Sequence, residues 1–262
     1  MKHIRSFKLI LVLSVIALCN ILPNFVEAAN QTTTFYNVYI PPGVALDELG
    51  HHLNVIKTQL QYKERSKFPE GPLYFVAIGK DVQELPNCIN CERIDHKITG
   101  NEISTLTKLQ EYCKENPDKN VAYMHNQPSF NNHEMNELLR RMLTKSVFSD
   151  ECLLLKNPTT RINNEKCTCN VCSARFSPIP HYHTSGNMWV ADCQYISKLV
   201  SPESLTAKMD HIVYNAPADR IGRPSTILGP FVGRGRYASG HWVYSHPDVC
   251  PCDVYPGPFT WK

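Results

Sequence analysis

The sequence predicts an α/β fold with a mostly parallel sheet flanked by helices. Three observations support this class: apolar strands and amphipathic helices alternate, each strand ends at a turn signal, and each helix repeats apolar residues at three- and four-residue steps. The predicted strands span 35–40, 73–78 and 120–124. The predicted helices span 45–63, 103–113 and 134–145.

The second half of the chain has a different character. Residues 157–180 are polar and rich in cysteine, which predicts a long loop held by disulfides. A short strand is expected at 187–191, and a helix is expected to begin within 194–200. Residues 217–262 are rich in Gly and Pro, so we expect an irregular wrap over the surface rather than a separate core. We therefore expect one domain over 35–262.

The amino terminus has the three-part pattern of a signal peptide. Basic residues precede an apolar run at 9–19, and small residues at 26–28 offer a cleavage site. The alternative is an uncleaved signal anchor, but a spanning helix needs roughly 20 apolar residues and this run is shorter. We expect residues 1–28 to be removed and the rest to enter the secretory pathway, secreted or in the ER or Golgi lumen. A membrane would be contacted only through an uncleaved anchor.

The cysteine count agrees with an oxidising compartment. Ten of the eleven cysteines follow the leader, and an even number in a secreted chain predicts disulfides. Cys250 and Cys252 are too close for an easy mutual bond, so each should pair elsewhere. An N-glycosylation sequon begins at Asn30.

Charge argues against a nucleic-acid partner. The formal net charge is +3, and most of it belongs to the leader. The remainder is nearly neutral and offers no basic footprint for a polyanion.

Two segments concentrate polar groups suited to ligand binding. Residues 181–189 place two imidazoles, a hydroxyl, an amide and an indole beside a glycine, although a polar loop that only caps and packs has the same composition. Residues 123–126 end a predicted strand, where parallel sheets bind ligands, although a strand end satisfying its own backbone is an equal alternative. A third segment alternates aromatics with His241 and His246, which a buried edge strand explains equally well.

A zinc cluster is a further alternative. Cys167, Cys169 and Cys172 are closely spaced and precede His181 and His183. Because thiols in secreted chains are usually oxidised, disulfides are favoured over zinc.

Four stretches, taken in order, resemble a known family. They cover 123–128, 136–141, 183–189 and 195–199, and the C-terminal His-Trp and Ser-His-Pro sequences are also similar. This order resembles uncharacterised glycosyltransferase-like proteins of bacteria, algae and protists, in which a Y-x-H-x-K-G strand end precedes paired arginines and an H-x-S-G-N-x-W loop leads into Y-I-x-x-L. The resemblance implies a nucleotide-sugar transferase with a GT-A-like α/β fold.

The resemblance also implies roles for individual residues. We expect a nucleotide on the first strands, and sugar and acceptor on the 181–189 loop. Asp192 and His183 are the candidates for a catalytic base. His125 and His246 are the candidate ligands for a divalent metal, Mn or Mg, although the chain lacks the Asp-x-Asp motif usual in such folds. The substrate-binding candidates are Tyr123, His125, Asn126, Arg140, Ser185, Gly186, Asn187 and Trp189.

The predicted function is a lumenal or secreted glycosyltransferase-like protein that moves a sugar from a nucleotide sugar to a glycan or protein acceptor. One alternative is a secreted, non-catalytic carbohydrate- or protein-binding module on a degenerate transferase fold. A second alternative is a zinc-dependent secreted enzyme that uses His181 and His183.

Overall fold

The architecture comes from a computed structural model of the 262-residue chain. The structure describes residues 32–126, 134–155, 158–160, 166–177, 182–184, 186–215 and 238–254. The leader, the Asn30 sequon, the cleavage site and the residues His181 and Ser185 therefore lie outside the described residues. Within the described part, no helix is long and apolar enough to cross a membrane.

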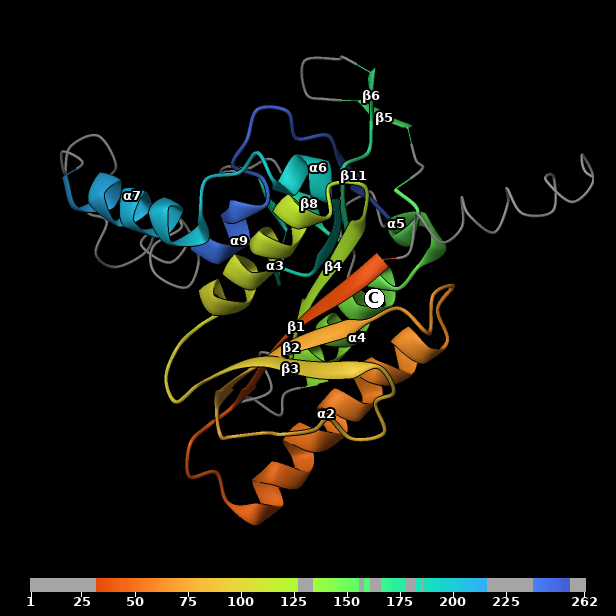
Figure 1. The fold of residues 1–262 in the computed structure, drawn as a ribbon, viewed down its shortest axis with the longest axis vertical. Helices are drawn as coiled ribbons and strands as arrows, with labels where there is room; N and C mark the ends of the chain where they lie inside the picture. Colours follow the sequence, from red (N-terminus) through yellow and green to blue (C-terminus); the bar gives the residue numbers. More distant parts are fainter. Residues whose placement is uncertain are drawn as a thin grey trace, which may run out of the picture. The chain divides into compact units, whose positions relative to one another are not determined.

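A seven-stranded sheet forms the centre of the fold, in the order β11-β7-β10-β4-β1-β2-β3 (Figure 1). The strands β1 (Thr32–Ile40), β2 (Leu73–Gly79), β3 (Cys91–Lys97) and β4 (Asn120–His125) are parallel. The strand β10 (Trp189–Asp192) runs antiparallel to both β4 and β7 (Val171–Ser173). The strand β11 (Pro251–Asp253) pairs parallel with β7 and ends the sheet. The predicted, mostly parallel α/β class is confirmed.

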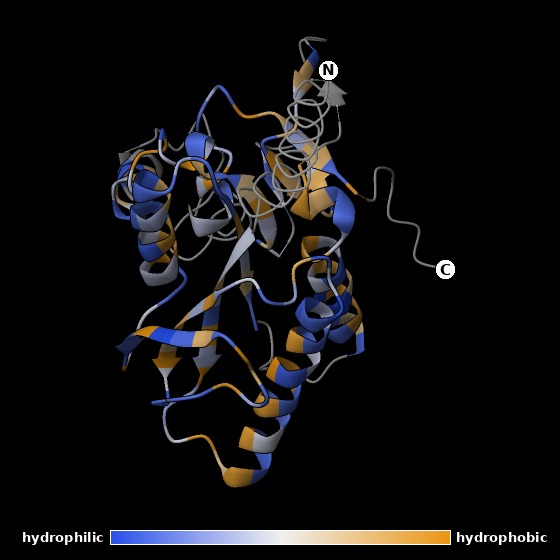
Figure 2. Cartoon of the chain, turned by 45° about the vertical axis from the view of Figure 1, so that its right-hand side comes forward, coloured by the Kyte–Doolittle hydropathy of each residue, from blue (hydrophilic) through white to orange (hydrophobic). Residues whose placement is uncertain are grey.

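Helices cover both faces of the sheet. On one face, α2 (Leu46–Glu64) and α4 (Glu134–Val147) pack over Tyr36, Val38 and Ile40. On the other face, α3 (Ile103–Glu115), α6 (Cys193–Ile196) and α9 (Ser239–Trp242) pack over Phe35, Val121 and Tyr123. Hydrophilic and hydrophobic residues alternate along α2, as expected of a helix with one buried face (Figure 2).

The smaller elements fall mainly in the second half. They are α5 (Asp150–Leu153), α7 (Pro202–Asn215), the pair β5 (Pro158–Thr160) and β6 (Lys166–Thr168), and the pair β8 (Phe176–Ser177) and β9 (His183–Thr184). The helix expected to begin within 194–200 corresponds to the short α6, and a second helix, α7, begins at Pro202.

The C-terminal segment is more ordered than predicted. Over 238–254, Trp242 and Val243 are buried in the core and β11 extends the main sheet. His241 lies in the short helix α9 instead of the edge strand considered for this segment. The expectation of an irregular wrap is therefore wrong for 238–254. The reason is that Trp242 packs in the same core as Trp189, with 6.2 Å between the two ring centres.

Disulfides join the cysteine-rich loop to the sheet. The pairs are Cys88–Cys91, Cys113–Cys193, Cys152–Cys172, Cys167–Cys250 and Cys169–Cys252. Disulfide bonding of all ten cysteines beyond the leader confirms the prediction, as does the separate pairing of Cys250 and Cys252. Two parallel bridges hold β11 and the segment before it against 167–169, which explains how so short a strand stays on the sheet edge.

Candidate functional site at the carboxyl edge of the sheet

The carboxyl end of β4 meets the start of β10. Because β10 is antiparallel to β4, its first residue, Trp189, lies opposite Tyr123, and the residues before it continue past the end of β4. Gly186 reaches His125 in this way, with its carbonyl oxygen 2.6 Å from His125 Nε2. Of the two segments singled out from the sequence, 123–126 therefore meets residues 186–189 of 181–189 at one edge of the sheet.

The centre of this edge is the carboxylate of Glu102. It is 9% exposed and stands immediately before α3. Its Oε2 accepts hydrogen bonds from the Tyr123 hydroxyl at 2.9 Å, from Asn187 Nδ2 at 2.5 Å and from the Ser239 hydroxyl at 3.4 Å. One carboxylate thus ties α3, β4, the turn before β10 and α9 together. A buried carboxylate needs such donors, since burying the charge without them is costly.

Tyr123 acts as a donor in this cluster. Burial raises the pKa of its phenol well above the usual value, and the neighbouring charge and hydrogen bond of Glu102 raise it further. The phenol therefore stays protonated at any physiological pH and keeps donating to Glu102.

Asn187 connects the cluster to the buried tryptophan. Its backbone is left-handed, with φ of 45°, a conformation that Asn tolerates better than most residues. This turns its Oδ1 toward the Trp189 indole, whose Nε1 donates to it at 3.0 Å. Trp189 itself is fully buried, with its ring centre 5.2 Å from that of Tyr123. The predicted sugar-stacking role of Trp189, and direct substrate contact by Tyr123, do not fit this burial, because both rings belong to the core.

Gly186 lets the turn pass close to α4. It has φ of +93°, and a Cβ at this position would lie 2.3 Å from the Leu143 side chain. The backbone angle therefore favours glycine, and any larger residue would also have to displace the Leu143 side chain.

Asn126 extends the pairing beyond the end of β4. Its Nδ2 donates to the Tyr39 carbonyl and its Oδ1 accepts from the Tyr39 N–H, both at 2.7 Å. The side chain copies a strand hydrogen-bond pair, so the alternative in which the strand end satisfies its own backbone holds for Asn126.

Two imidazoles lie next to the cluster. His183 in β9 and His241 in α9 have ring centres 6.1 Å apart, and both are half-buried. His241 follows Ser239, a donor to Glu102, by two residues in α9. The two histidines are therefore titratable groups with solvent access in this part of the fold.

The chain matches one family, DUF8361, described as a domain of unknown function, over residues 35–262. It belongs to the DUF8361 family. The comparison with curated proteins gives no match.

Three predicted site residues of the DUF8361 domain lie away from this edge. Asp192 pairs in register with Asn120, the first residue of β4, and so lies at the opposite end of the strand from His125. Its carboxylate caps α6 by accepting from the Gln194 N–H at 2.7 Å, and burial raises its pKa. Asp192 is thus a helix cap, and the structure does not bring it to the site as a base.

His246 also has other neighbours. Its ring centre lies 6.2 Å from that of Tyr195 in α6, and its Nδ1 lies 3.8 Å from an Asp248 oxygen. Arg140 projects from α4 on the opposite face of the sheet, toward α2. Neither residue shares a described contact with the Glu102 cluster.

The residues predicted to hold a divalent metal do not fit one. The Nε2 atom of His125 lies against the Gly186 carbonyl, and His246 has a separate set of neighbours. Three sulfur atoms, from Cys169, Cys172 and Cys252, lie within 4.8 Å of one another, but all three belong to disulfides. A disulfide sulfur is not the thiolate that zinc binds, so the cysteines of the predicted zinc cluster do not fit zinc.

Glu102 and Asn37 are two buried polar residues that the sequence analysis does not predict as candidates for the site. An acid at the start of a helix is ordinarily a dipole or capping residue, so Glu102 gave no signal of its own. Asn37 lies within β1, fully buried; its Oδ1 accepts from the Thr105 hydroxyl at 2.8 Å, while its Nδ2 has no partner among the described residues. An amide in the middle of an apolar strand was the available signal for it.

Proposed function

We propose that the protein is a lumenal or secreted glycosyltransferase-like protein that binds a nucleotide sugar at the carboxyl edge of the sheet. The supporting observation is that residues 123–126 and 186–189 converge: His125 lies against the Gly186 carbonyl, and both Tyr123 and Asn187 donate to Glu102. In α/β sheets, ligands bind in the crevice outside the carboxyl ends of the strands. The sheet order, with one antiparallel strand beside four parallel ones, is compatible with the GT-A-like fold that the sequence resemblance implies.

Within this proposal the described residues have different tasks. The buried set of Glu102, Tyr123, Asn187 and Trp189 holds the edge rigid from behind, which is the support that a positioned site requires. His183 is the candidate base, because it is half-buried, stands on the same edge and can take the proton of an acceptor hydroxyl.

The test is ligand binding followed by substitution. Purified mature protein is screened against uridine, guanosine and cytidine diphosphate sugars by thermal shift, with Mn²⁺ and with EDTA, and hits are titrated by calorimetry. His183→Ala should lower turnover by about 10²–10⁴-fold if His183 is the base, with little loss of stability. The matched control is His211→Ala on the exposed side of α7, which should change neither quantity.

A non-catalytic binding module is the second candidate. It is favoured by the use of Asn126, Tyr123 and Trp189 in strand pairing and core packing, and by the poor fit of the metal-ligand candidates. Binding of a free glycan without any nucleotide-sugar binding or turnover would select this function over the transferase.

A further inference from the structure

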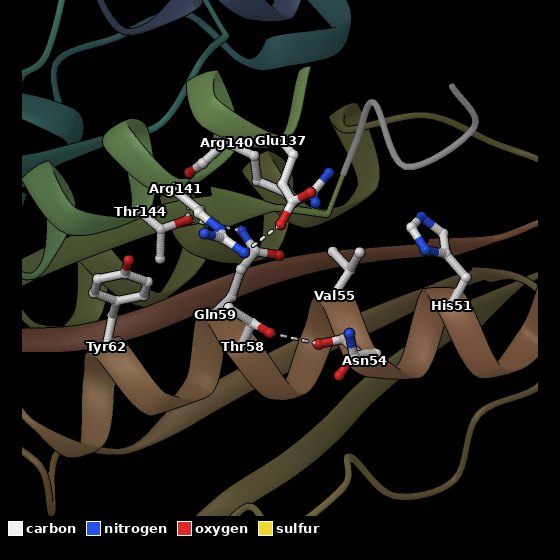
Figure 3. A pocket seen from close by; sticks show the side chains of 10 residues that line it. All are labelled: His51, Asn54, Val55, Thr58, Gln59, Tyr62, Glu137, Arg140, Arg141 and Thr144. Atoms are coloured by element: carbon white, nitrogen blue, oxygen red, sulfur yellow. Dashed lines mark hydrogen bonds and ion pairs between the residues drawn. The ribbon is translucent and has the colours of Figure 1, made fainter. Parts of the chain in front are cut away.

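A crevice between α2 and α4 lies on the face of the sheet opposite the Glu102 cluster (Figure 3). Its cavity volume is about 140 Å³. Its walls are mainly polar, with Asn54, Thr58 and Tyr62 from α2 and with two arginines from α4, Arg140 and Arg141. The lining contains more cations than anions, since it has two arginines and one carboxylate, that of Glu137.

Arg140 is the unusual group in this crevice. The residue is 7% exposed, and no hydrogen bond or ion pair of its guanidinium occurs among the described residues. The nearest carboxylate, Glu137, pairs one turn later with Arg141 instead. Burial lowers the pKa of Arg140, but an arginine remains charged at every physiological pH. Among the described residues, this buried cation feels the Glu137 carboxylate but has no ion pair of its own, which is an unfavourable state unless an anion binds.

The other polar groups at the crevice floor are already engaged. The Gln59 side chain donates to the His125 carbonyl at 3.1 Å and to Thr144 Oγ1 at 3.0 Å, and accepts from the Tyr36 hydroxyl at 2.7 Å. Thr144 donates in turn to the Arg140 carbonyl at 2.8 Å. These bonds fix the floor rigidly, whereas the Arg140 guanidinium, which also lines the crevice (Figure 3), makes no such bond among the described residues.

We propose that this crevice binds a tetrahedral oxyanion, a sulfate or a phosphate group, through Arg140. The guanidinium fork matches two oxygens of such a group, and Arg141, at the exposed rim, adds long-range attraction. Asn54 and Tyr62 line the remaining space and offer an amide and an aromatic face to whatever carries the anion, so either a free ion or a sugar ester fits. The crevice lies on the other face of the sheet from the Glu102 cluster, with Gln59 bonded to the His125 carbonyl between them, and the proposal does not depend on the nucleotide-sugar function.

The test uses the full mature protein with no nucleotide present. Sodium sulfate, sodium phosphate and glucose 6-phosphate are titrated by thermal shift and calorimetry against sodium chloride at equal ionic strength. We expect the melting temperature to rise with the logarithm of the oxyanion concentration and not with chloride. An ester that binds more than about tenfold tighter than the free ion would identify the sugar ester as the ligand, and equal affinities would identify the free ion.

Two substitutions of the same residue separate binding from folding. Arg140→Met keeps the side-chain length and removes the buried charge, so the variant should melt at or above the wild-type temperature without oxyanion and should show no oxyanion response. Arg140→Lys keeps the charge but loses the fork, and should weaken binding by about tenfold. Arg65→Met, an exposed arginine at the end of α2, is the control and should respond as the wild type does.

The same measurements can overturn the proposal. An oxyanion response that persists in Arg140→Met, or a wild-type response no larger than that to chloride, would show that the crevice is not an oxyanion site. A large loss of stability in Arg140→Met without oxyanion would show that the guanidinium is structural.

Discussion

The carboxylate of Glu102 accepts a hydrogen bond from the side-chain amide of Asn187, 85 residues further along the chain. The contact joins the start of α3, in the regular first half of the fold, to the turn that precedes β10 in the irregular second half. Because Glu102 also accepts from Tyr123 and Ser239, the carboxyl edge of the sheet is organised around one buried acid.

Glu102→Ala should lower the free energy of unfolding by about 3 kcal/mol or more, because it leaves the hydroxyl of Tyr123 and the amide of Asn187 buried without their acceptor. Urea denaturation followed by fluorescence measures the change. The control is Glu111→Ala on the exposed face of α3, which loses only a surface ion pair with Lys108 and should cost less than about 1 kcal/mol. Equal losses for the two variants would show that the Glu102 cluster contributes nothing specific.

Gly79→Ala and Gly50→Ala should change stability in opposite directions. At Gly79, with φ of +87°, a Cβ would lie 2.1 Å from the Ile40 carbonyl oxygen, which accepts the Lys80 N–H at 2.8 Å. The clash is with backbone, so β1 and β2 must separate locally and we expect a loss of about 2 kcal/mol or more. Gly50 lies within α2 with open space around it, and alanine there should stabilise the protein by about 0.5–1 kcal/mol. Thermal unfolding of the two variants checks the signs.

The strands and helices of the first half of the chain could be predicted from residue patterns. The contacts that form the Glu102 cluster could not. The strands and helices at 35–40, 45–63, 73–78, 103–113, 120–124 and 134–145 were found within a few residues, because their periodicity is set by one buried face. The strand β3 (Cys91–Lys97) was missed because it is a charged edge strand, only partly buried, without alternation of apolar residues.

The site could be predicted only in part, because it also depends on strand pairing that local sequence patterns do not determine. The position of His125 and Asn126 at the end of a predicted strand marks them as candidate site residues. The composition of the following turn does the same for Gly186 and Asn187. The pairing of β10 with β4 in antiparallel register decides that these residues meet while Asp192 lies at the other end, and no local pattern encodes that register. The resemblance alone makes Arg140 a substrate-binding candidate, whereas the helical phase of α4 turns it toward α2.

The disulfides should differ widely in their contribution to stability. Cys113–Cys193 spans 80 residues and ties α3 to α6, whereas Cys88–Cys91 spans three. Since the stabilisation grows with the length of the closed loop, replacing both cysteines of the first pair by alanine should cost about 4 kcal/mol, and the same change in the second pair should cost clearly less. Urea unfolding of the two double variants under oxidising conditions makes the comparison. A larger loss for the Cys88–Cys91 pair would contradict the loop-length argument.

Acid should destabilise the fold through His52. Burial lowers the pKa of His52 below its usual 6.5, and the adjacent His51 lowers it further, although Glu48 opposes the shift. With the folded pKa below the unfolded one, the contribution of His52 is complete above about pH 6.5 and is lost as the pH falls through the folded pKa. The slope of unfolding free energy between pH 7 and pH 5 should therefore be shallower in His52→Leu than in the wild type, and an unchanged slope would rule His52 out as its source.

Photoaffinity labelling with a nucleotide sugar tests the central claim most directly. Mature protein is irradiated with an azido analogue of the donor that binds best, with and without an excess of the unmodified donor, and the labelled peptides are mapped by mass spectrometry. The account predicts labelling that the donor suppresses, in peptides from the carboxyl ends of β1 and β4 and from the 182–189 segment. Absence of donor binding across the panel, or labelling confined to the amino edge of the sheet around Asp192 or to the α2–α4 crevice, would contradict it.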